Sequence, residues 1–545
     1  MIRINQITVP VTVKDQEKEI RKRAAVMLRI PEDGFRKFKV IKRSLDARDK
    51  SDLRFSYTAD VKLRDTFTGP NRNTELQYIE KLHNRNITQI EVMPLKIPDV
   101  KEEKRDARPV IIGSGPAGLF AALTLCSAGL KPVIIERGSR ADDRKKKCDI
   151  LFDTGKLNTA SNIQFGEGGA GLFSDGKLNT QIKGRESYIR FVLETFNEFG
   201  APDEILTDSK PHIGTDILMD IVKNMRGFIE ENGGTYYFDT LFTGFETENG
   251  KVCAAVLNGG EMKLPASQIL LCQGHSARDT YRMLKDSGVS LSKKAFAMGV
   301  RVQHPQRLID EALYGKDDLL LKEEILGPAS YKLTHKASNG RSIFSFCMCP
   351  GGYVINSSSE EGGLCVNGMS YNKRDSGMAN SALIVNVTPG DFPGDELSGL
   401  SLQRELEEKA YNLRGGLIPY ETFGEFEKGE TMPSGEGFEP AFMGLSAPAD
   451  VKSILPEFMQ EAITEGMHAF SREIKDFDSP DSIIAGVEAR TSSPVRISRD
   501  ENFETNVPGL LACGEGAGYA GGITSAACDG LRAAIALIER LNSED

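Results

Sequence analysis

The sequence contains no run of about 18 apolar residues, the length that a membrane-spanning helix requires. Its nine cysteines include no CxxC pair and form no cluster with histidine. We therefore expect neither a disulfide framework nor a bound metal. The first residues alternate like a strand and lack the basic segment and apolar core of a secretory signal. Together these absences favour a cytoplasmic protein with reduced cysteines.

Length and composition indicate a globular protein of several domains. The chain has 545 residues and a mass of 59.7 kDa, about three to four times the usual single-domain length. Hydrophobic residues make up 39% of the chain and charged residues 27%, and the mean hydropathy is -0.31. Such values are typical of water-soluble proteins with a sizeable buried core.

Charge divides the chain unevenly. Residues 1–110 carry 25 Lys and Arg against 17 Asp and Glu, whereas the rest of the chain carries 43 against 61. This asymmetry suggests a separate basic module at the N-terminal end, followed by a charged linker over 96–108. The hydrophobic pattern of the module predicts a β-α-β-β-α-β order, which is a ferredoxin-like split βαβ arrangement. The expected elements are a strand over 2–13, a helix over 16–28, strands over 35–44 and 53–63, a helix over 75–83 and a strand over 87–93.

A dinucleotide fingerprint follows the linker. An apolar strand leads into the glycine-rich stretch 113–118, which opens a helix, and Glu136 closes the next strand. In this context Gly113 permits a tight turn, Gly115 lets the backbone approach a diphosphate, and Gly118 allows close helix packing. We expect the helix N-terminus to bind the diphosphate and Glu136 to bind an adenosine ribose. The expected cofactor contacts of this unit are Gly113, Gly115, Pro116, Ala117, Gly118, Glu136 and Arg137.

A second glycine-rich stretch, 166–171, has the same spacing without the same context. The residues before it make a poor buried strand, and those after it cannot open a long helix. We interpret it as a loop whose bare backbone lies against a flat ligand, with a flexible surface loop as the alternative. The expected contacts of this loop are Gly168, Gly169, Gly171 and Ser174.

The C-terminal segment indicates which dinucleotide is bound. A strand ending in an acidic residue, Glu515, is followed by a pair of glycines and an apolar helix. This arrangement resembles the second signature of FAD proteins of the glutathione-reductase structural class, in which an acidic residue, usually Asp, binds the ribityl chain. The next helix points its positive end at the flavin and stabilises the reduced form. The expected FAD contacts here are Gly514, Glu515, Gly522, Ile523 and Thr524. A separate stretch, 268–274, resembles the strand and glycine that precede the return to the FAD domain in the same class, and it adds Gly274.

These motifs, together with the stretches 161–177, 211–216 and 346–352, look like a family of bacterial flavoproteins described as uncharacterised FAD-dependent or NAD-utilising dehydrogenases. The resemblance covers nearly the whole chain. It implies FAD as the cofactor and an α/β fold, in which a Rossmann-like FAD-binding domain holds an inserted α+β substrate domain beside the ferredoxin-like α+β domain. The expected boundaries are 1–100 for the basic module, 107–294 and 481–545 for the two parts of the FAD-binding domain, and 295–480 for the insertion.

Three side chains are candidates for catalysis, because the flavin itself accepts the hydride and few others are obligatory. Lys177 is a candidate cation near flavin N5 or a substrate carboxylate, with a solvated lysine as the alternative. Arg490 either clamps an anionic substrate or forms a structural ion pair with Glu488 or a neighbour. His212 is a candidate general acid, although a buried structural histidine is the favoured alternative.

Cys347 and Cys349 raise the question of a thiol site. Residues two apart on a strand point the same way, so both thiols could face the flavin. A disulfide between them would be strained. Small thiols that pack beside the flavin ring are therefore favoured over a redox dithiol.

We expect an FAD-dependent oxidoreductase that transfers a hydride between flavin N5 and a small, anionic organic substrate. No second strand-GxGxxG-helix unit occurs, so NAD(P)H would have to act as a transient reductant. Two alternatives stay open, an RNA-associated flavoprotein whose basic module holds nucleic acid and a non-catalytic FAD-binding scaffold. The strands of the module have no paired aromatics of the kind that stack RNA bases, so nucleic acid is the less favoured partner. The sequence makes no prediction of oligomeric state.

Overall fold

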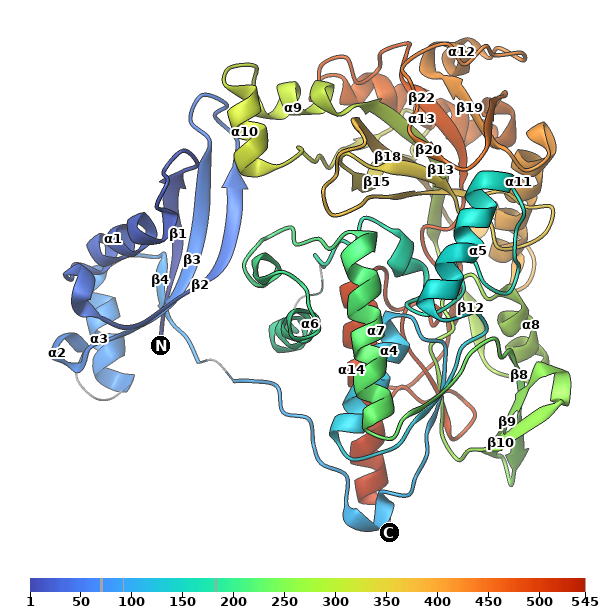
Figure 1. Cartoon of the computed structure of the whole chain (residues 1–545), viewed down its shortest axis with the longest axis horizontal. Coiled ribbons are helices and arrows are strands. Elements are labelled where there is room, and N and C mark those ends of the chain that lie inside the picture. Colours follow the sequence, from blue (N-terminus) through green and yellow to red (C-terminus); the bar gives the residue numbers. More distant parts are fainter. Residues whose placement is uncertain (69–71, 92, 181, 183, 545) are drawn as a thin grey trace.

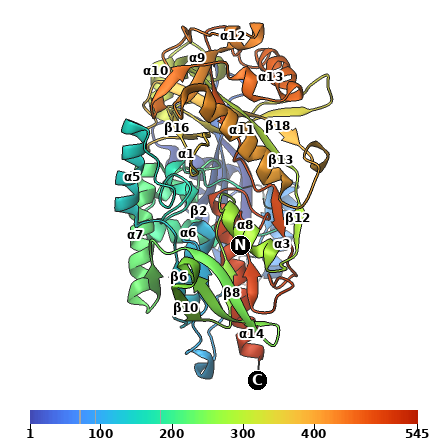
Figure 2. The same cartoon turned by 90° about the vertical axis from the view of Figure 1, so that its right-hand side faces the viewer.

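The computed structural model describes residues 1–68, 72–91, 93–180, 182 and 184–544, and it has the mixed α/β fold that the sequence predicts. Figure 1 shows three parts: the N-terminal module on the left, a parallel sheet with its helices in the lower half, and the long middle stretch above them. The view in Figure 2 keeps the middle stretch at the top and the end of the C-terminal helix at the bottom.

The N-terminal module is a four-stranded antiparallel sheet with strand order β2-β3-β1-β4. Alternate residues of β1 are buried, and helix α1 buries Ile20, Ala24 and Leu28 along one stripe. The order of elements along the chain is the one expected of a split βαβ arrangement. These elements are β1 (Ile2–Pro10), α1 (Gln16–Leu28), β2 (Phe35–Asp46), β3 (Arg54–Leu63), α2 (Asp65–Thr68), α3 (Arg72–Leu82) and β4 (Ile87–Gln89).

The second part is built on a five-stranded parallel sheet with order β24-β11-β5-β6-β7. Its strands come from two distant segments, because β24 near the C-terminus pairs with β11. The helices α4, α7 and α14 cover one face (Figure 1) and pack on Ile111, Ile134 and Leu270. The bounds are β5 (Val110–Ile112), α4 (Pro116–Ser127), β6 (Val133–Ile135), α7 (Thr215–Glu231), β7 (Thr235–Tyr237), β11 (Ile269–Leu271), β24 (Leu510–Ala512) and α14 (Ile523–Ser543).

A small antiparallel sheet covers the other face of the parallel sheet. The alternate residues Val110, Ile112 and Val133 form a second core with Phe242 and Val252 from this small sheet. Both faces of the parallel strands are thus buried, which explains their uninterrupted apolar sequences. The small sheet consists of β8 (Phe242–Glu248), β9 (Lys251–Leu257) and β10 (Met262–Pro265).

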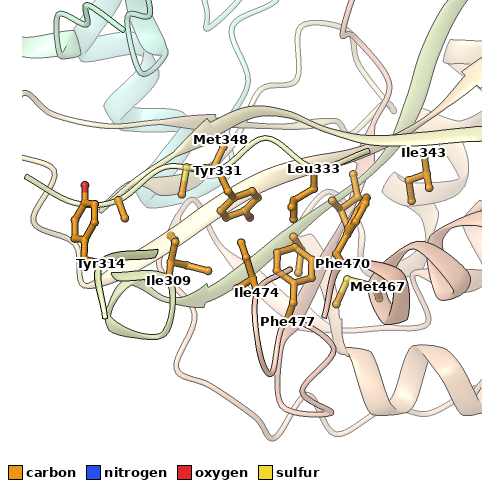
Figure 3. Close-up of a cluster of buried hydrophobic side chains, with 14 of the residues drawn as sticks. Ile309, Tyr314, Tyr331, Leu333, Ile343, Met348, Met467, Phe470, Ile474 and Phe477 are labelled. Atoms are coloured by element: carbon orange, nitrogen blue, oxygen red, sulfur yellow. The ribbon is translucent and has the colours of Figure 1, made fainter. Parts of the chain in front are cut away.

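The insertion is built on a seven-stranded sheet with order β14-β15-β18-β13-β22-β19-β21. Figure 3 shows its main core, where Met467 and Phe470 of helix α13 lie close to Phe477, Leu333 and Ile343. The bounds are β13 (Phe296–Pro305), α9 (Gln306–Tyr314), α10 (Leu319–Leu326), β14 (Thr334–Lys336), β15 (Ser342–Cys349), β18 (Met378–Val387), α11 (Ser398–Arg414), β19 (Ile418–Thr422), α12 (Phe423–Lys428), β21 (Ser446–Pro448), α13 (Glu457–Phe470) and β22 (Ile483–Glu488).

Smaller elements complete the chain. A second sheet in the insertion has the order β17-β16-β20, and a two-stranded sheet pairs β12 with β23. Helices α5, α6 and α8 belong to the segment before the insertion. The bounds are α5 (Ala141–Thr154), α6 (Glu186–Glu198), α8 (Arg278–Asp286), β12 (Leu291–Lys293), β16 (Tyr353–Asn356), β17 (Val366–Met369), β20 (Phe442–Met443) and β23 (Val495–Ile497).

Strand β22 corrects the expected end of the insertion. The sequence suggested that the insertion ends at residue 480, with 481–545 in the FAD-binding domain. In the structure β22 lies in the middle of the seven-stranded sheet, where it pairs with β13 and β19. Every residue of the strand is buried, and the chain returns to the parallel sheet only after it.

The fold predicts opposite effects of one substitution at two helical glycines. A Cβ on Gly118 in α4 would lie 1.9 Å from the Gly113 carbonyl oxygen, whereas a Cβ on Gly227 in α7 would meet no atom of the described residues within 4 Å. Gly118→Ala should therefore destabilise the protein by about 1–3 kcal/mol, and Gly227→Ala should stabilise it by up to about 1 kcal/mol. Thermal unfolding of both variants checks this. Equal midpoints for the two variants would contradict the packing described.

Candidate active site

A cavity of about 480 Å³ opens at the carboxyl ends of the parallel strands and extends to the insertion. Open α/β sheets bind their ligands at this edge, and the volume is that of a small-molecule site. The predicted residues that line it are Gly113, Gly115, Pro116, Ala117, Glu136, Arg137, Gly169, Gly171, Ser174, Lys177, Gly274, Arg490, Glu515, Gly522 and Ile523. The predicted residues outside its lining are Gly118, Gly168, His212, Gly514 and Thr524.

The first glycine turn forms one wall. Gly113 has a φ of 101°, and a Cβ there would lie 2.5 Å from the carbonyl oxygen of Cys272. Gly115 is the N-cap of α4, so the free N–H groups of the first helical turn lie at the cavity. Gly118 contacts the Gly113 carbonyl instead of the cavity, which is a packing role. This wall presents bare backbone and a positive helix end, which suit a diphosphate.

Glu136 is buried between the two glycine loops. Its Oε2 accepts hydrogen bonds from the Ser114 backbone (2.9 Å) and hydroxyl (2.8 Å). Its Oε1 accepts from the backbone of Gly138 (2.9 Å) and Gly166 (3.0 Å). These four bonds fill the acceptor sites of an ionised carboxylate, so a ribose hydroxyl has to replace one of them. The Ser114 hydroxyl, which rotates freely, is the partner most easily replaced.

The second glycine stretch is held by Arg144, a residue that the sequence analysis missed. The side chain of Arg144 is fully buried, and it donates hydrogen bonds to the loop carbonyls of Asn162 (2.8 Å), Ile163 (2.8 Å), Gly166 (3.3 Å), Glu167 (2.6 Å) and Gly169 (2.9 Å). Because five bonds to one side chain fix the loop, the alternative of a flexible surface loop is wrong. The loop touches the first glycine turn, since a Cβ on Gly169 would lie 2.8 Å from the Gly115 Cα. The position of Arg144 inside a charged helix gives no sequence signal for this role.

The C-terminal signature is arranged differently from its prediction. Glu515 lies at the cavity, where its Oε1 is 2.8 Å from Nδ1 of His275. Gly514 is bound away from the cavity, with its N–H on Asp529 at 2.9 Å. Thr524 is likewise turned away, and its hydroxyl donates to the Leu178 carbonyl at 2.7 Å. Gly514 and Thr524 therefore position the segment and do not face the cavity.

Two buried polar side chains at the cavity have unused hydrogen-bonding atoms. Among the described residues, neither amide atom of Gln273 nor Nε2 of His275 has a partner. Buried polar atoms are nearly always paired in proteins, so these atoms point to a polar ligand. Neither residue was predicted, because a lone histidine or glutamine after a strand has no pattern of its own.

A cluster of cations lies at the end of the cavity near the insertion. Nζ of Lys177 is 2.8 Å from the buried carboxylate of Asp175, which Arg374 also binds at 2.5 Å. Burial opposes ionisation of Asp175, but Lys177 and Arg374 outweigh it and hold its pKa at about 2. Lys210 also lines the cavity, and burial lowers its pKa, followed by repulsion from Lys177 and Arg374. Two of the three cations thus bind the one carboxylate, and Lys210 is left without it.

His212 does not have the position of a general acid. It pairs through its backbone with Lys177 and lies outside the cavity lining. Burial, followed by the charge of Arg374, lowers the pKa of His212 to about 4. The ring is therefore neutral at pH 7 and lacks the acidic second proton of an imidazolium. Its place is that of the structural histidine considered as the alternative.

Arg490 is occupied by a buried ion pair, so its guanidinium is not free to clamp a substrate. It binds both oxygens of Glu407 at 2.8 Å, and Arg278 binds the same carboxylate at 2.8 and 2.9 Å. Glu488, the partner that the sequence suggested, instead binds Arg301 at 2.6 Å. Because Glu407 lies on α11, some 80 residues away, its pairing could not be predicted from spacing. Arg490 joins α11 to the end of β22.

Arg144→Lys should weaken FAD binding. A lysine donates fewer hydrogen bonds than the guanidinium and cannot reach five carbonyls in a plane, so the loop loses its fixed shape. We expect the dissociation constant of FAD to rise at least about 10-fold, since bonds to a charged group contribute roughly 1.5–3 kcal/mol. Lys146→Ala, on the exposed face of the same helix, is the control. An unchanged FAD affinity in Arg144→Lys would show that Arg144 does not shape the loop for FAD binding.

Glu407→Gln should strongly destabilise the protein. It leaves two buried guanidinium groups without their shared carboxylate, which costs about 3–5 kcal/mol. Glu408→Gln is the matched control, because its pair with Arg404 is half exposed and is worth about 0–1 kcal/mol. Chemical unfolding should show a clearly lower midpoint for the first variant only. Similar midpoints would show that the buried triad does not stabilise the fold.

The residues of the cavity fit FAD. Glycine backbone faces the cavity at positions where a side chain would intrude. The N-terminus of α4 lies at the cavity, and buried polar atoms of Gln273 and His275 have no partner among the described residues. Family comparison agrees: a model described as an FAD binding domain matches residues 106–152, and one described as an FAD-dependent protein, C-terminal domain-like, matches 295–491. The protein is therefore an FAD-dependent flavoprotein. A domain of unknown function matches residues 1–62.

Similarity to solved structures is low. The flavin-dependent brominase Bmp2 is 14% identical with a TM-score of 0.37, over 81% of this chain and 80% of that one. A geranylgeranyl bacteriochlorophyll reductase-like protein from Thermoplasma acidophilum is 13% identical with a TM-score of 0.34, over 81% and 79% of the two chains. TM-scores this low say nothing of the reaction of this protein. Within the described residues, no helix is both long and apolar enough to cross a membrane.

A much closer relative comes from Clostridium beijerinckii. It is an uncharacterised protein that is 40% identical over 546 aligned residues, covering 99% of both chains. Identity at this level over the full length includes all the parts described above. The chain therefore belongs to the same family as this Clostridium beijerinckii protein.

Proposed function

We propose that the protein is an FAD-dependent oxidoreductase that transfers a hydride between flavin N5 and a small anionic organic substrate. One observation carries the proposal: the cavity that fits FAD continues without a break to the cations Lys177, Lys210 and Arg374. When bound, FAD supplies the two-electron chemistry. The residues of the chain then have to bind the substrate, orient it and exclude water.

The charge of the cluster favours an anion. Asp175 is saturated by Lys177 and Arg374, and it is fully buried, so it cannot also neutralise Lys210. Among the described residues, Lys210 donates a hydrogen bond to the hydroxyl of Ser330 at 3.4 Å. A carboxylate or another anion near Lys210 would offset part of this excess positive charge.

The first turn of α14 is placed to stabilise the negative charge of a reduced flavin. This helix begins at Ile523, and Gly522 and Ile523 both line the cavity. Its positive N-terminal end stabilises negative charge, which the flavin gains on reduction. No separate dinucleotide motif accompanies it, so NAD(P)H is proposed only as a transient reductant.

Nucleic acid is outside the proposal because several cations of the basic module are already engaged. Arg43 binds Asp208 at 2.7 Å, and Arg23 binds Glu19 at 2.6 Å. Arg21 lies over the ring of Phe35 at 5.4 Å. The excess positive charge thus pairs partly within the protein, as charge on a small module commonly does.

Anaerobic flavin reduction tests the proposed function. The purified protein, with FAD bound, is mixed without oxygen with NADH, NADPH, carboxylic acids and amines in turn, and the flavin absorbance is followed. We expect at least one anionic donor to bleach the flavin within seconds to minutes. A colourless protein that does not take up FAD contradicts the proposal. A bound flavin that none of these donors reduces favours a non-catalytic scaffold.

Lys210→Gln should weaken the binding of the anionic donor found in that assay. Loss of one charge-assisted contact is worth roughly 1.5–3 kcal/mol, so KM or Kd should rise at least about 10-fold. The limiting rate of flavin reduction should change much less, because the flavin site is intact. Lys146→Gln, an exposed lysine on α5, serves as control. An unchanged KM would place the anion elsewhere.

A further inference from the structure

Cys347 and Cys349 lie where strand β15 becomes irregular, in the wall shared by the cavity and the insertion. From Phe346 to Cys349 the chain advances three residues while its partner β18 advances two, which is a β-bulge. Cys347 occupies the extra position with a φ of 44°, a conformation that few residues other than glycine adopt. Bulges often redirect a side chain next to an active site. The regular alternation assumed from the sequence therefore does not apply, and Cys347 lines the cavity.

Two cations hold the backbone of this segment. Arg301, whose side chain is fully buried, donates to the Cys347 carbonyl at 3.2 Å and lies 3.8 Å from Sγ of Cys349. Lys177 donates to the carbonyl of Met348 between them. Sγ of Cys349 in turn lies 3.2 Å from the Cys347 carbonyl oxygen. Both cysteines are thus fixed beside positive charge.

This setting shifts the pKa values of the two thiols in opposite directions. Interaction with the Cys349 side chain lowers the pKa of Cys347 to about 5; burial opposes this shift, and Lys177 and Arg301 reinforce it. The same coupling raises the pKa of Cys349 well above its usual range. The acidic groups nearby, Asp175 and Glu488, are each bound by a cation. Deprotonation of the pair is therefore favoured at Cys347, while Cys349 keeps its proton, the combination that thiol–disulfide chemistry uses.

A second cysteine pair at the cavity has the opposite character. The sulfur atoms of Cys272 and Cys513 are 3.2 Å apart at the carboxyl ends of β11 and β24. Their mutual hydrogen bond and burial raise the pKa of Cys272 well above its usual value. No cation within the described residues is among the causes of that shift. The Cys272 thiol therefore keeps its proton and is a poor nucleophile.

We propose that Cys347 and Cys349 are a redox pair that exchanges two electrons with the flavin in this cavity. The proposal rests on the proposed function in one respect, that FAD occupies the cavity. In the oxidative direction an S–S bond forms between the two sulfurs. The Cys347 thiolate and the Cys349 thiol together lose two electrons and one proton. Oxidised FAD gains the same two electrons and the proton at N5, so charge and atoms balance.

The short separation of the two cysteines suits a reversible step. A disulfide between residues two apart departs from relaxed geometry, and strained disulfides are more easily reduced. The feature that argued against the pair as a structural disulfide thus favours it as one that opens and closes. The flavin and the pair together would store two electron pairs, one more than the flavin alone.

An anaerobic reductive titration tests this directly. The air-oxidised protein with bound FAD, freed of small thiols, is titrated with dithionite while flavin absorbance and added electrons are counted. Wild type should take up four electrons per FAD, and Cys347→Ser and Cys349→Ser should each take up two. Cys253→Ser, at a cysteine in β9 away from the cavity, should behave as wild type. Cys513→Ser tests the rival pair and should also take up four.

The outcomes separate the two proposals. A wild type that binds FAD but accepts only two electrons overturns the redox pair and leaves the proposed function standing. If Cys513→Ser takes up only two electrons while Cys347→Ser and Cys349→Ser take up four, the second electron pair belongs to Cys272 and Cys513. A protein without FAD removes both proposals.

Alkylation of the wild-type protein also tests whether Cys347 and Cys349 form a reducible disulfide, and it does not depend on the folding of a variant. Cys347 and Cys349 should resist iodoacetamide in the unfolded air-oxidised protein and react after anaerobic reduction, as mass spectrometry of their shared peptide would show. Alkylation of both before reduction contradicts the proposal.

Discussion

The cofactor cavity depends on one buried cation, Arg144. Its guanidinium fixes the backbone of residues 161–171 through five carbonyl oxygens, and a side chain at Gly166 would lie 2.4 Å from the Cδ of Arg144. Burying an arginine without a carboxylate is costly unless dipoles replace the lost water, and the loop carbonyls do so. The loop can then present its other side to the first glycine turn and to the cavity.

The same segment connects the two ends of the site. It begins beside the glycine turn that suits a diphosphate, and it runs on to Asp175 and Lys177 at the basic end. There Lys177 reaches across to the carbonyl of Met348 in the insertion. The insertion is thus joined to the FAD-type domain by charge as well as by the chain itself. Cys347, the cations and the glycine loops line the same cavity.

Patterns in the sequence predicted those parts of the fold whose residues are close together in the chain. Gly113, Gly115 and Glu136 could be placed because a strand, a turn and a helix follow one another within a few dozen residues. The partner of Arg490 could not be placed, since Glu407 approaches only after the insertion has folded. The same holds for β22, whose neighbours β13 and β19 are distant in the chain. The bulge at Cys347 has no local signal either, because it arises from pairing with β18.

We expect one FAD molecule to span the whole cavity, with its diphosphate at the glycine turn and its ring system at the basic end. A crystal structure of the protein with FAD bound measures this most directly. It should show the diphosphate on the N-terminus of α4, and the isoalloxazine ring between the N-terminus of α14 and the Cys347–Cys349 segment. A flavin ring at the opposite end, or FAD bound outside this cavity, would contradict the account.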